Sequence, residues 1–246
     1  MSKYGKWIGL GLGWAFGGPI GGILGLAVGS MFDYSGSSDA DAGAATATAP
    51  GHTRRGDYAA SLLVLVAAVM KADGKVMKSE LEYVRNFFRS RFGSETASEA
   101  MIMLRDILKQ EIPLRDVSRQ MSQRLDYSSR LEMIHFLFGI AAADADVSEA
   151  EKQIISAIAG YMEVSSGDYE SILAMFTGRS DAAYRILEIE PTATDDEVKK
   201  AYREMAKKYH PDKVGYLGDD FKKVAHEKFQ KVQDAYDKIC KERGIK

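Results

Sequence analysis

The sequence predicts an all-α protein in three parts: an N-terminal glycine-rich transmembrane helix, a helical bundle with an internal repeat, and a C-terminal antiparallel helical hairpin. Three observations lead to this fold class. Residues 7–32 contain no charged side chain. A helical pattern that starts at Ser61 recurs 71 residues later. Two amphipathic segments flank a His-Pro-Asp tripeptide at residues 210–212.

The composition of the whole chain is ordinary for a soluble protein, with 46% hydrophobic residues, 28% charged residues and a net charge of −2. Such a balance does not favour nucleic acid as the main partner. The 246 residues leave room for two small domains. The single cysteine, Cys240, excludes an internal disulfide and suits a reducing compartment.

Residues 1–33 are predicted to form a membrane helix in which glycine recurs at every fourth position. A glycine costs a helix in water about 1 kcal/mol relative to alanine, so this segment is a poor helix in water. Inside a bilayer the backbone must satisfy its own hydrogen bonds, and helix becomes the default. Small residues four apart let two helices approach closely, which predicts a homodimer through this segment. The predicted dimer contacts are Gly17, Gly21, Gly25 and Gly29.

Two other interpretations of this segment remain open. Lys3 and Lys6 resemble the charged start of a signal peptide, although the apolar stretch is long and no clear cleavage site follows. The second interpretation is a re-entrant or surface-lying segment with a kink at Pro19. Residues 34–54 are small and polar and predict a flexible linker, because they cannot bury enough apolar surface to fold.

Residues 55–178 are predicted to form a helical bundle with internal pseudo-twofold symmetry. Each copy of the repeat is an apolar helix, a turn opened by an aspartate, and a second helix with an acid near its start. A shift of 71 residues aligns Asp73 with Asp144, Val76 with Val147, Glu80 with Glu151, and Val84 with Ile155. His135 lies in an apolar run and is predicted to be a core histidine.

The repeated Ala-Asp-x-x-Val-x-x-x-Glu pattern resembles the TerB-like (tellurite-resistance B) domain. The resemblance implies divalent-metal binding through clustered acids, for which the candidates are Asp73, Glu80, Asp144 and Glu151. The alternative, which we favour, is that the aspartates hold turns and the glutamates cap helix starts, with no metal and no cofactor. An EF-hand does not fit, because neither loop supplies oxygens at the positions that calcium requires.

The C-terminal segment is organised around the tripeptide at residues 210–212. Thr194 and Glu197 form a capping box that predicts a helix start. Pro211 ends that helix and opens a turn, which Asp212 is expected to hold by bonding to the backbone. The apolar face of this helix consists of Val198, Ala201, Tyr202, Met205 and Tyr209. A second amphipathic helix carries Ala225, Phe229, Val232, Tyr236 and Ile239.

Residues 181–246 resemble a J domain, through "PTATDDEVKKAYREMAKKYHPDK" and "KFQKVQDAYDKI". The resemblance implies two antiparallel helices with the His-Pro-Asp turn at their tip. It also implies a partner, a DnaK-type chaperone, whose ATP hydrolysis the domain stimulates. The chaperone-binding residues would be Lys199, Lys200, Tyr202, Arg203, Lys207, Lys208, His210, Pro211 and Asp212. Glu204 departs from the usually basic pattern and weakens the positive face.

The order of membrane segment, TerB-like bundle and J domain resembles a family of membrane-anchored DnaJ-like co-chaperones. We therefore predict a co-chaperone and not an enzyme, since no nucleophile pattern surrounds His226. The alternative is an envelope-stress or metal-responsive sensor with an accessory J domain. A nucleic-acid binder is disfavoured by the balanced charge.

The predicted location is the bacterial inner membrane, with a single span and cytoplasmic C-terminal domains. Lys3 and Lys6 favour a cytoplasmic N-terminus by the positive-inside rule. A J domain works with an ATP-driven chaperone, which requires the C-terminus in the cytoplasm. Two lysines are a small bias, and the functional argument decides the prediction.

Overall fold

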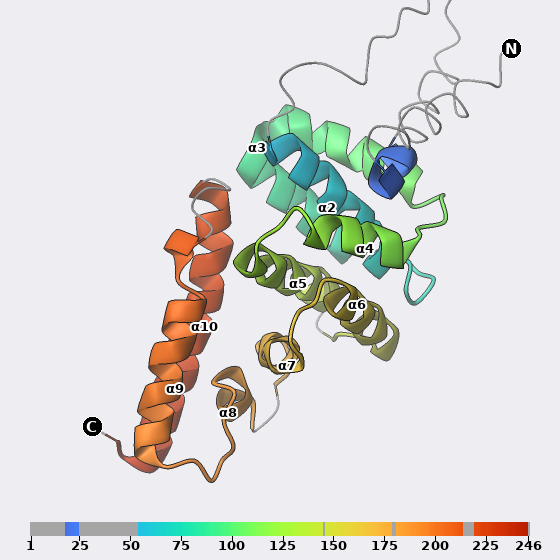
Figure 1. The fold of residues 1–246 in the computed structure, drawn as a ribbon. Coiled ribbons are helices and arrows are strands. Elements are labelled where there is room, and N and C mark those ends of the chain that lie inside the picture. The colour runs from blue at the N-terminus through green and yellow to red at the C-terminus, as the bar shows by residue number, and fades with distance from the viewer. Residues whose placement is uncertain (1–17, 25–53, 145, 179–180, 214–218, 246) are drawn as a thin grey trace, which may run out of the picture. The chain divides into compact units, whose positions relative to one another are not determined.

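The computed structural model describes residues 18–24, 54–144, 146–178, 181–213 and 219–245. Every regular element in these ranges is helical, which confirms the predicted all-α class (Figure 1). The elements are α2 Arg54–Met70, α3 Lys78–Ile107, α4 Leu114–Ser122, α5 Tyr127–Ala141, η1 Ala142–Asp144, α6 Glu149–Tyr161, α7 Ser166–Ala174, α8 Ala182–Ile186, α9 Asp195–Lys208 and α10 Asp219–Arg243.

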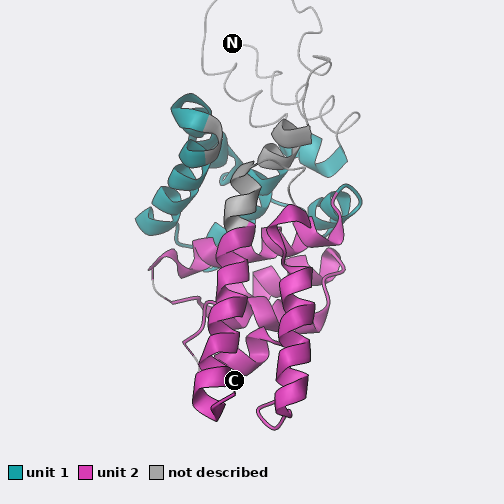
Figure 2. Ribbon diagram, turned by 90° about the vertical axis from the view of Figure 1, so that its left-hand side faces the viewer, with its two compact units in different colours: residues 1–124 teal, residues 125–246 magenta. Residues whose placement is uncertain are grey.

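The chain divides into two compact units, residues 1–124 and 125–246 (Figure 2). The division falls between α4 and α5, inside the predicted bundle of residues 55–178. One copy of the repeat therefore belongs to each unit. The second copy shares its unit with the C-terminal hairpin.

In the first unit, α2 packs against α3 and α4. Residues 62–67 and 69–70 of α2 are buried or nearly so, because this helix is apolar on almost all sides. Two residues of α4, Val117 and Met121, lie one turn apart and complete the core. Helix α3 is kinked at Gly93, whose φ of 86° is accessible to glycine at little cost.

Residues 18–24 are helical and belong to the first unit. The Ile20 N–H donates a hydrogen bond of 3.0 Å to Oε1 of Gln120, and Ile20 and Ile23 are buried. Among the described residues, no helix combines the length and apolarity that a bilayer crossing needs. The rest of the predicted membrane span and the linker, with Gly17, Gly25 and Gly29, lie outside the described residues, whereas Gly21 is described and half-buried.

The second unit contains α5 to α10. Its core is built on α5, where Leu131, Ile134 and Phe138 are fully or almost fully buried. Helices α6 and α7 pack on α5, and α8 packs on both α7 and α10. Helices α9 and α10 lie side by side as an antiparallel hairpin (Figure 1).

The predicted faces of the hairpin are confirmed by burial. Residues Val198, Ala201, Met205 and Tyr209 of α9 are buried, as are Ala225, Val232 and Ile239 of α10. Tyr202 is half-buried and stacks on Tyr236, with 4.2 Å between ring centroids. The predicted capping box is present: the Thr194 N–H donates to Oε2 of Glu197 at 2.7 Å, and the Glu197 N–H donates to Oγ1 of Thr194.

Candidate functional site

A short exposed corner follows the end of α9. Residues 211–213 form one turn of 3-10 helix, because Pro211 cannot continue the α-helix and biases His210 away from helical geometry. The Lys213 N–H closes this turn by donating to the His210 carbonyl at 3.0 Å. The side chains of His210 and Asp212 are 52% and 83% exposed. The corner therefore presents an imidazole and a carboxylate to solvent.

A second hydrogen bond of the corner lies within the described residues: Nδ1 of His210 accepts the Asp212 N–H at 3.3 Å. The backbone groups after Lys213 that the Asp212 carboxylate is predicted to bond lie outside the described residues. An oxygen of the Asp212 carboxylate lies 3.6 Å from the same Nδ1. Because Nδ1 is the acceptor, the neutral ring carries its proton on Nε2. The corner thus offers one N–H donor and one carboxylate acceptor to a partner.

An open hollow adjoins the corner. It is lined by Ala206, Lys207, His210, Lys213 and Phe229. The edge of one ring of the His210–Phe229 pair faces the other ring, with 6.1 Å between the ring centroids. This contact restrains the imidazole and gives the corner an apolar floor.

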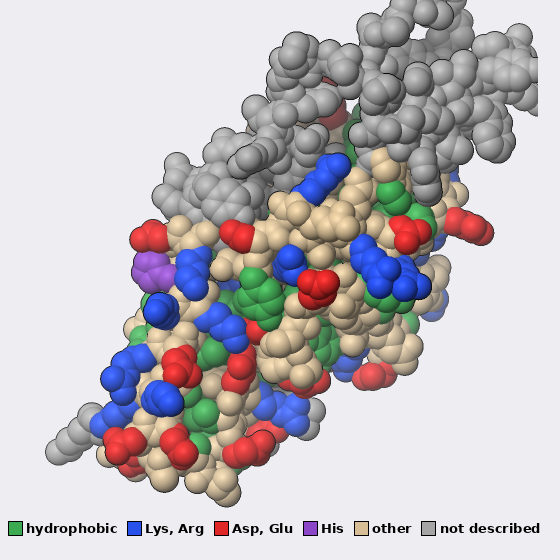
Figure 3. All heavy atoms as spheres, in the orientation of Figure 1, with side chains coloured by type: hydrophobic (Ala, Val, Ile, Leu, Met, Phe, Trp, Pro, Cys, Tyr) green, Lys and Arg blue, Asp and Glu red, His purple; other side chains and the backbone are tan. Residues whose placement is uncertain are grey.

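Four basic residues of α9, Lys199, Lys200, Arg203 and Lys207, form what we call the basic ridge. All but Lys199 are exposed. Nε of Arg203 donates to the Lys199 carbonyl at 3.1 Å, which holds the guanidinium along the helix. An oxygen of Glu204 lies 3.9 Å from Nζ of Lys200, where its negative charge opposes that of the lysine. Blue and red side chains are interspersed over this part of the surface in Figure 3.

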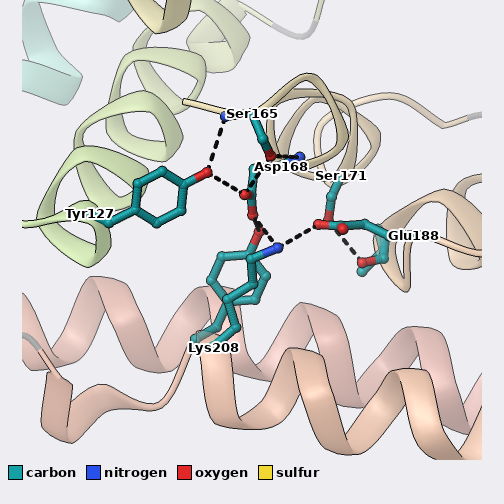
Figure 4. Close-up of polar contacts among 8 residues, drawn as sticks. Tyr127, Ser165, Asp168, Ser171, Glu188 and Lys208 are labelled. Carbon is teal, nitrogen blue, oxygen red and sulfur yellow. Dashed lines mark hydrogen bonds and ion pairs between the residues drawn. The ribbon is translucent and has the colours of Figure 1, made fainter. Parts of the chain in front are cut away.

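Lys208 is not part of the basic ridge. Its Nζ lies 2.6 Å from Oδ1 of Asp168 on α7 and 2.9 Å from Oε1 of Glu188 (Figure 4). Burial alone would lower the pKa of Lys208, but the two carboxylates outweigh burial and raise it above its usual value. The structure therefore separates Lys208 from the other basic residues that the sequence grouped with it.

Asp168 is a functional candidate that the sequence did not reveal. Its side chain is 2% exposed and accepts four bonds. Tyr127 and Ser165 donate to Oδ2 at 2.6 and 2.7 Å. Tyr209 donates to Oδ1 at 2.9 Å, beside the Lys208 ammonium. In sequence Asp168 looks like an ordinary first-turn acid behind the helix cap Ser165, which it also is.

A second buried ion pair joins α10 to α5. Nζ of Lys228 lies 2.5 Å from Oε1 of Glu132, and the two side chains are 1% and 4% exposed. The same ammonium lies 4.5 Å from the centre of the Tyr209 ring. Burial lowers the pKa of Lys228 despite the attraction of Glu132. Its spacing from Ala225 and Val232 places Lys228 on the apolar face of α10, which is the sequence signal that could have identified it.

His135 is buried on α5, as predicted. Its ring centroid lies 4.8 Å from that of Phe176. Burial, with a smaller contribution from the positive charges of Lys228 and Lys231, lowers the pKa of His135 to about 3. The imidazole is therefore neutral at physiological pH. His226 on α10 is exposed.

The four acids considered for metal binding make local contacts. Oδ1 of Asp73 accepts the Lys75 N–H at 2.9 Å. Glu80 and Glu151 each accept the N–H of the residue three positions before them, at 2.7 and 2.8 Å. Asp144 ends η1. Within the described parts of the chain, no group of three or more His, Cys, Asp or Glu side chains is arranged to hold a metal ion.

Three family models match the chain in succession. Residues 1–47 match the co-chaperone DjlA transmembrane domain, residues 59–174 match the tellurite resistance protein TerB, and residues 182–244 match the DnaJ domain. The matches follow the order that the sequence predicted.

Curated relatives match along the whole chain. The co-chaperone protein DjlA of Coxiella burnetii is 26% identical, with 100% of both chains covered. The protein of the same name from Photobacterium profundum is 27% identical, over 99% of this chain and 100% of its own. The one from Vibrio cholerae is 29% identical, over 78% and 80%. No solved structure matches.

Proposed function

We propose that this chain, which carries the transmembrane, TerB and DnaJ domains of a DjlA-type co-chaperone, binds a DnaK-type chaperone and stimulates its ATP hydrolysis. The observation that carries the proposal is the corner at residues 210–212. Its His210 and Asp212 side chains are exposed, although the helix that ends there is fixed by buried contacts on its other face. Such a preformed corner binds without a large ordering cost.

The basic ridge supports the same partner. Lys200, Arg203 and Lys207 project from the helix that leads to the corner. A positive surface of this kind attracts an acidic patch and orients it during encounter. The ridge would set the association rate and its salt dependence, while the corner makes the short-range contacts.

The chemistry of hydrolysis belongs to the partner. A co-chaperone changes the partner's rate only by binding one of its conformations more tightly than another. Nε2–H of His210 and the Asp212 carboxylate are the donor and acceptor that would distinguish those conformations. Loss of either group should therefore affect stimulation more than simple association.

The test is His210→Gln in the full chain, with His226→Gln as the matched control. Both histidines are exposed, so neither change should alter stability by more than about 0.5 kcal/mol. His210→Gln should return the ATP hydrolysis rate of a DnaK-type chaperone to its unstimulated value, whereas His226→Gln should stimulate normally. Normal stimulation by His210→Gln would refute the proposal.

We further propose that residues 1–33 span the bacterial inner membrane once, which requires residues 18–24 to leave their contact with Gln120, and that residues 52–246 lie in the cytoplasm, where a DnaK-type chaperone finds ATP. The DjlA transmembrane match over residues 1–47 supports membrane anchoring. Protease added outside spheroplasts should leave residues 52–246 intact. Digestion of the C-terminal domains from the periplasmic side would contradict this topology.

We call the glycines at every fourth position, which include Gly17, Gly21, Gly25 and Gly29, the glycine row. This row supports a homodimer through the membrane segment. Each four-residue step drifts about 40° around a helix of 3.6 residues per turn. Two helices that follow the row must therefore cross at an angle, with about three glycines at the closest approach. Leucine at Gly21 or Gly25 should hold the helices apart and lower crosslinking in membranes. Leucine at Gly22, which lies off the row, is the control, and equal crosslinking in all three variants would exclude the glycine row as the dimer contact.

A further inference from the structure

The DnaJ domain shares a buried polar network with the TerB domain. Asp168 on α7 binds both Lys208 and Tyr209, the two residues that precede the His-Pro-Asp corner. Glu132 on α5 binds Lys228 on α10. Oγ of Ser171 on α7 donates to the Ile186 carbonyl on α8 at 2.8 Å. Each helix of the DnaJ domain is thus connected to the TerB domain by a polar contact.

Each oxygen of the Asp168 carboxylate accepts two bonds (Figure 4). Tyr127 and Ser165 of its own domain donate to Oδ2. Lys208 and Tyr209, at the end of α9, bind Oδ1. Burial would raise the pKa of Asp168, but the bonds from Lys208, Tyr127 and Ser165 outweigh burial and lower it. The carboxylate is therefore ionised and holds the Lys208 ammonium by charge.

The two neighbouring lysines at the end of α9 have opposite surroundings. Lys207 is exposed and lines the hollow beside His210. The ammonium of Lys208 lies between two carboxylates. A charge balanced by two nearby opposite charges adds little to the potential that an approaching partner meets.

We propose that the TerB domain restrains the DnaJ domain: Asp168 of the TerB domain, together with Glu188 of the DnaJ domain itself, holds Lys208 away from the surface that meets the chaperone. In this arrangement, the TerB domain sets the positive charge that the DnaJ domain presents. Breaking the Asp168–Lys208 contact would add Lys208 to the basic ridge and increase attraction to an acidic partner. This inference rests on the proposed co-chaperone function.

The test measures the association rate of the full chain with an ATP-bound DnaK-type chaperone at several salt concentrations. Lys207→Ala should slow association about two- to threefold at low salt and flatten its salt dependence. Lys208→Ala should change the association rate by less than about 1.5-fold, because its charge is already balanced. Asp168→Asn should accelerate association about two- to threefold and steepen the salt dependence. The double variant Asp168→Asn/Lys208→Ala should lose that acceleration.

The controls separate this inference from the proposed function. If Lys208→Ala slows association as much as Lys207→Ala, Lys208 already contacts the partner and the inference is wrong. If Lys207→Ala and His210→Gln both have no effect, the proposed function fails instead. Should Asp168→Asn not fold, the comparison of Lys208→Ala with Lys207→Ala decides, because a restrained Lys208 adds little to association and an unrestrained one adds as much as Lys207. Unchanged association for a folded Asp168→Asn would overturn the restraint.

Discussion

The two copies of the TerB repeat have the same helix–turn–helix pattern, but at three buried positions in and just after the repeat the first has an uncharged residue and the second an ionisable one. The 71-residue shift aligns Ser61 with Glu132, Val64 with His135, and Ala97 with Asp168. All six residues are buried. The first copy has uncharged residues at these positions, whereas the second has ionisable ones, two of which bind lysines of the DnaJ domain. Apolar and turn residues thus suffice to build either copy. The buried carboxylates Glu132 and Asp168 connect the TerB domain to the DnaJ domain.

The largest difference in stability cost between the two copies should appear at the Ser61–Glu132 pair. Glu132→Ala leaves the Lys228 ammonium buried without its partner, which should cost the second unit about 3–5 kcal/mol. The equivalent change Ser61→Ala in the first copy should cost no more than about 1 kcal/mol. Denaturant unfolding with hydrogen exchange measures both, at α5 and α10 for Glu132→Ala and at α2 for Ser61→Ala. Replacing the pair together, as Glu132→Leu with Lys228→Met, should recover most of the loss. Equal costs at Glu132 and Ser61 would show that the ion pair does not distinguish the copies.

The aligned residues Ala97 and Asp168 can be exchanged, each for the residue at the other position. Asp168→Ala leaves the hydroxyls of Tyr127 and Tyr209 without an acceptor and should cost about 2–3 kcal/mol. Ala97→Asp should destabilise the first unit by a similar amount, because Ala97 is buried and a carboxylate placed there loses its hydration. The pKa of Asp168 is lowered in the folded state from 3.8, so its contribution is present above that pH and is lost as the pH falls through the folded pKa.

Acid unfolding of Asp168→Ala and the parent chain measures this contribution. The variant should lose less stability than the parent on acidification below about pH 4. Identical acid profiles would exclude Asp168 as the ionised centre of the network.

His135 should make the second unit sensitive to mild acid. Its pKa of about 3 lies below the ordinary 6.5, so the unfolded chain binds the proton more readily and stability falls as the pH drops from 6.5 towards 3. His135→Val, which restores the residue of the first copy, should remove about 2 kcal/mol of this loss at pH 5. Melting temperatures between pH 4.5 and 7.5 test it. An unchanged slope would show that His135 does not control the acid sensitivity.

Much of the molecule could be predicted because its signals are local. The capping box at Thr194, the face from Val198 to Tyr209 and the turn at Pro211 each depend on residues within a few positions of one another. The contacts of Asp168 could not be predicted in this way, since its partners Tyr127 and Tyr209 are each 41 residues away. Lys208 continues the basic spacing of α9, and only its surroundings distinguish it from Lys207.

The smallest predicted loss of stability should be the same in the two copies. Glu80 and Glu151 occupy aligned positions, and each accepts a backbone N–H at its helix start. Glu80→Gln and Glu151→Gln should each cost about 0.5–1 kcal/mol, because a neutral amide oxygen is a weaker acceptor at the positive end of a helix. Divalent cations should not change the melting temperature of the parent chain or either variant if these acids serve only as caps. Stabilisation of the parent by such a cation, lost in both variants, would instead support a metal site built from the repeated acids.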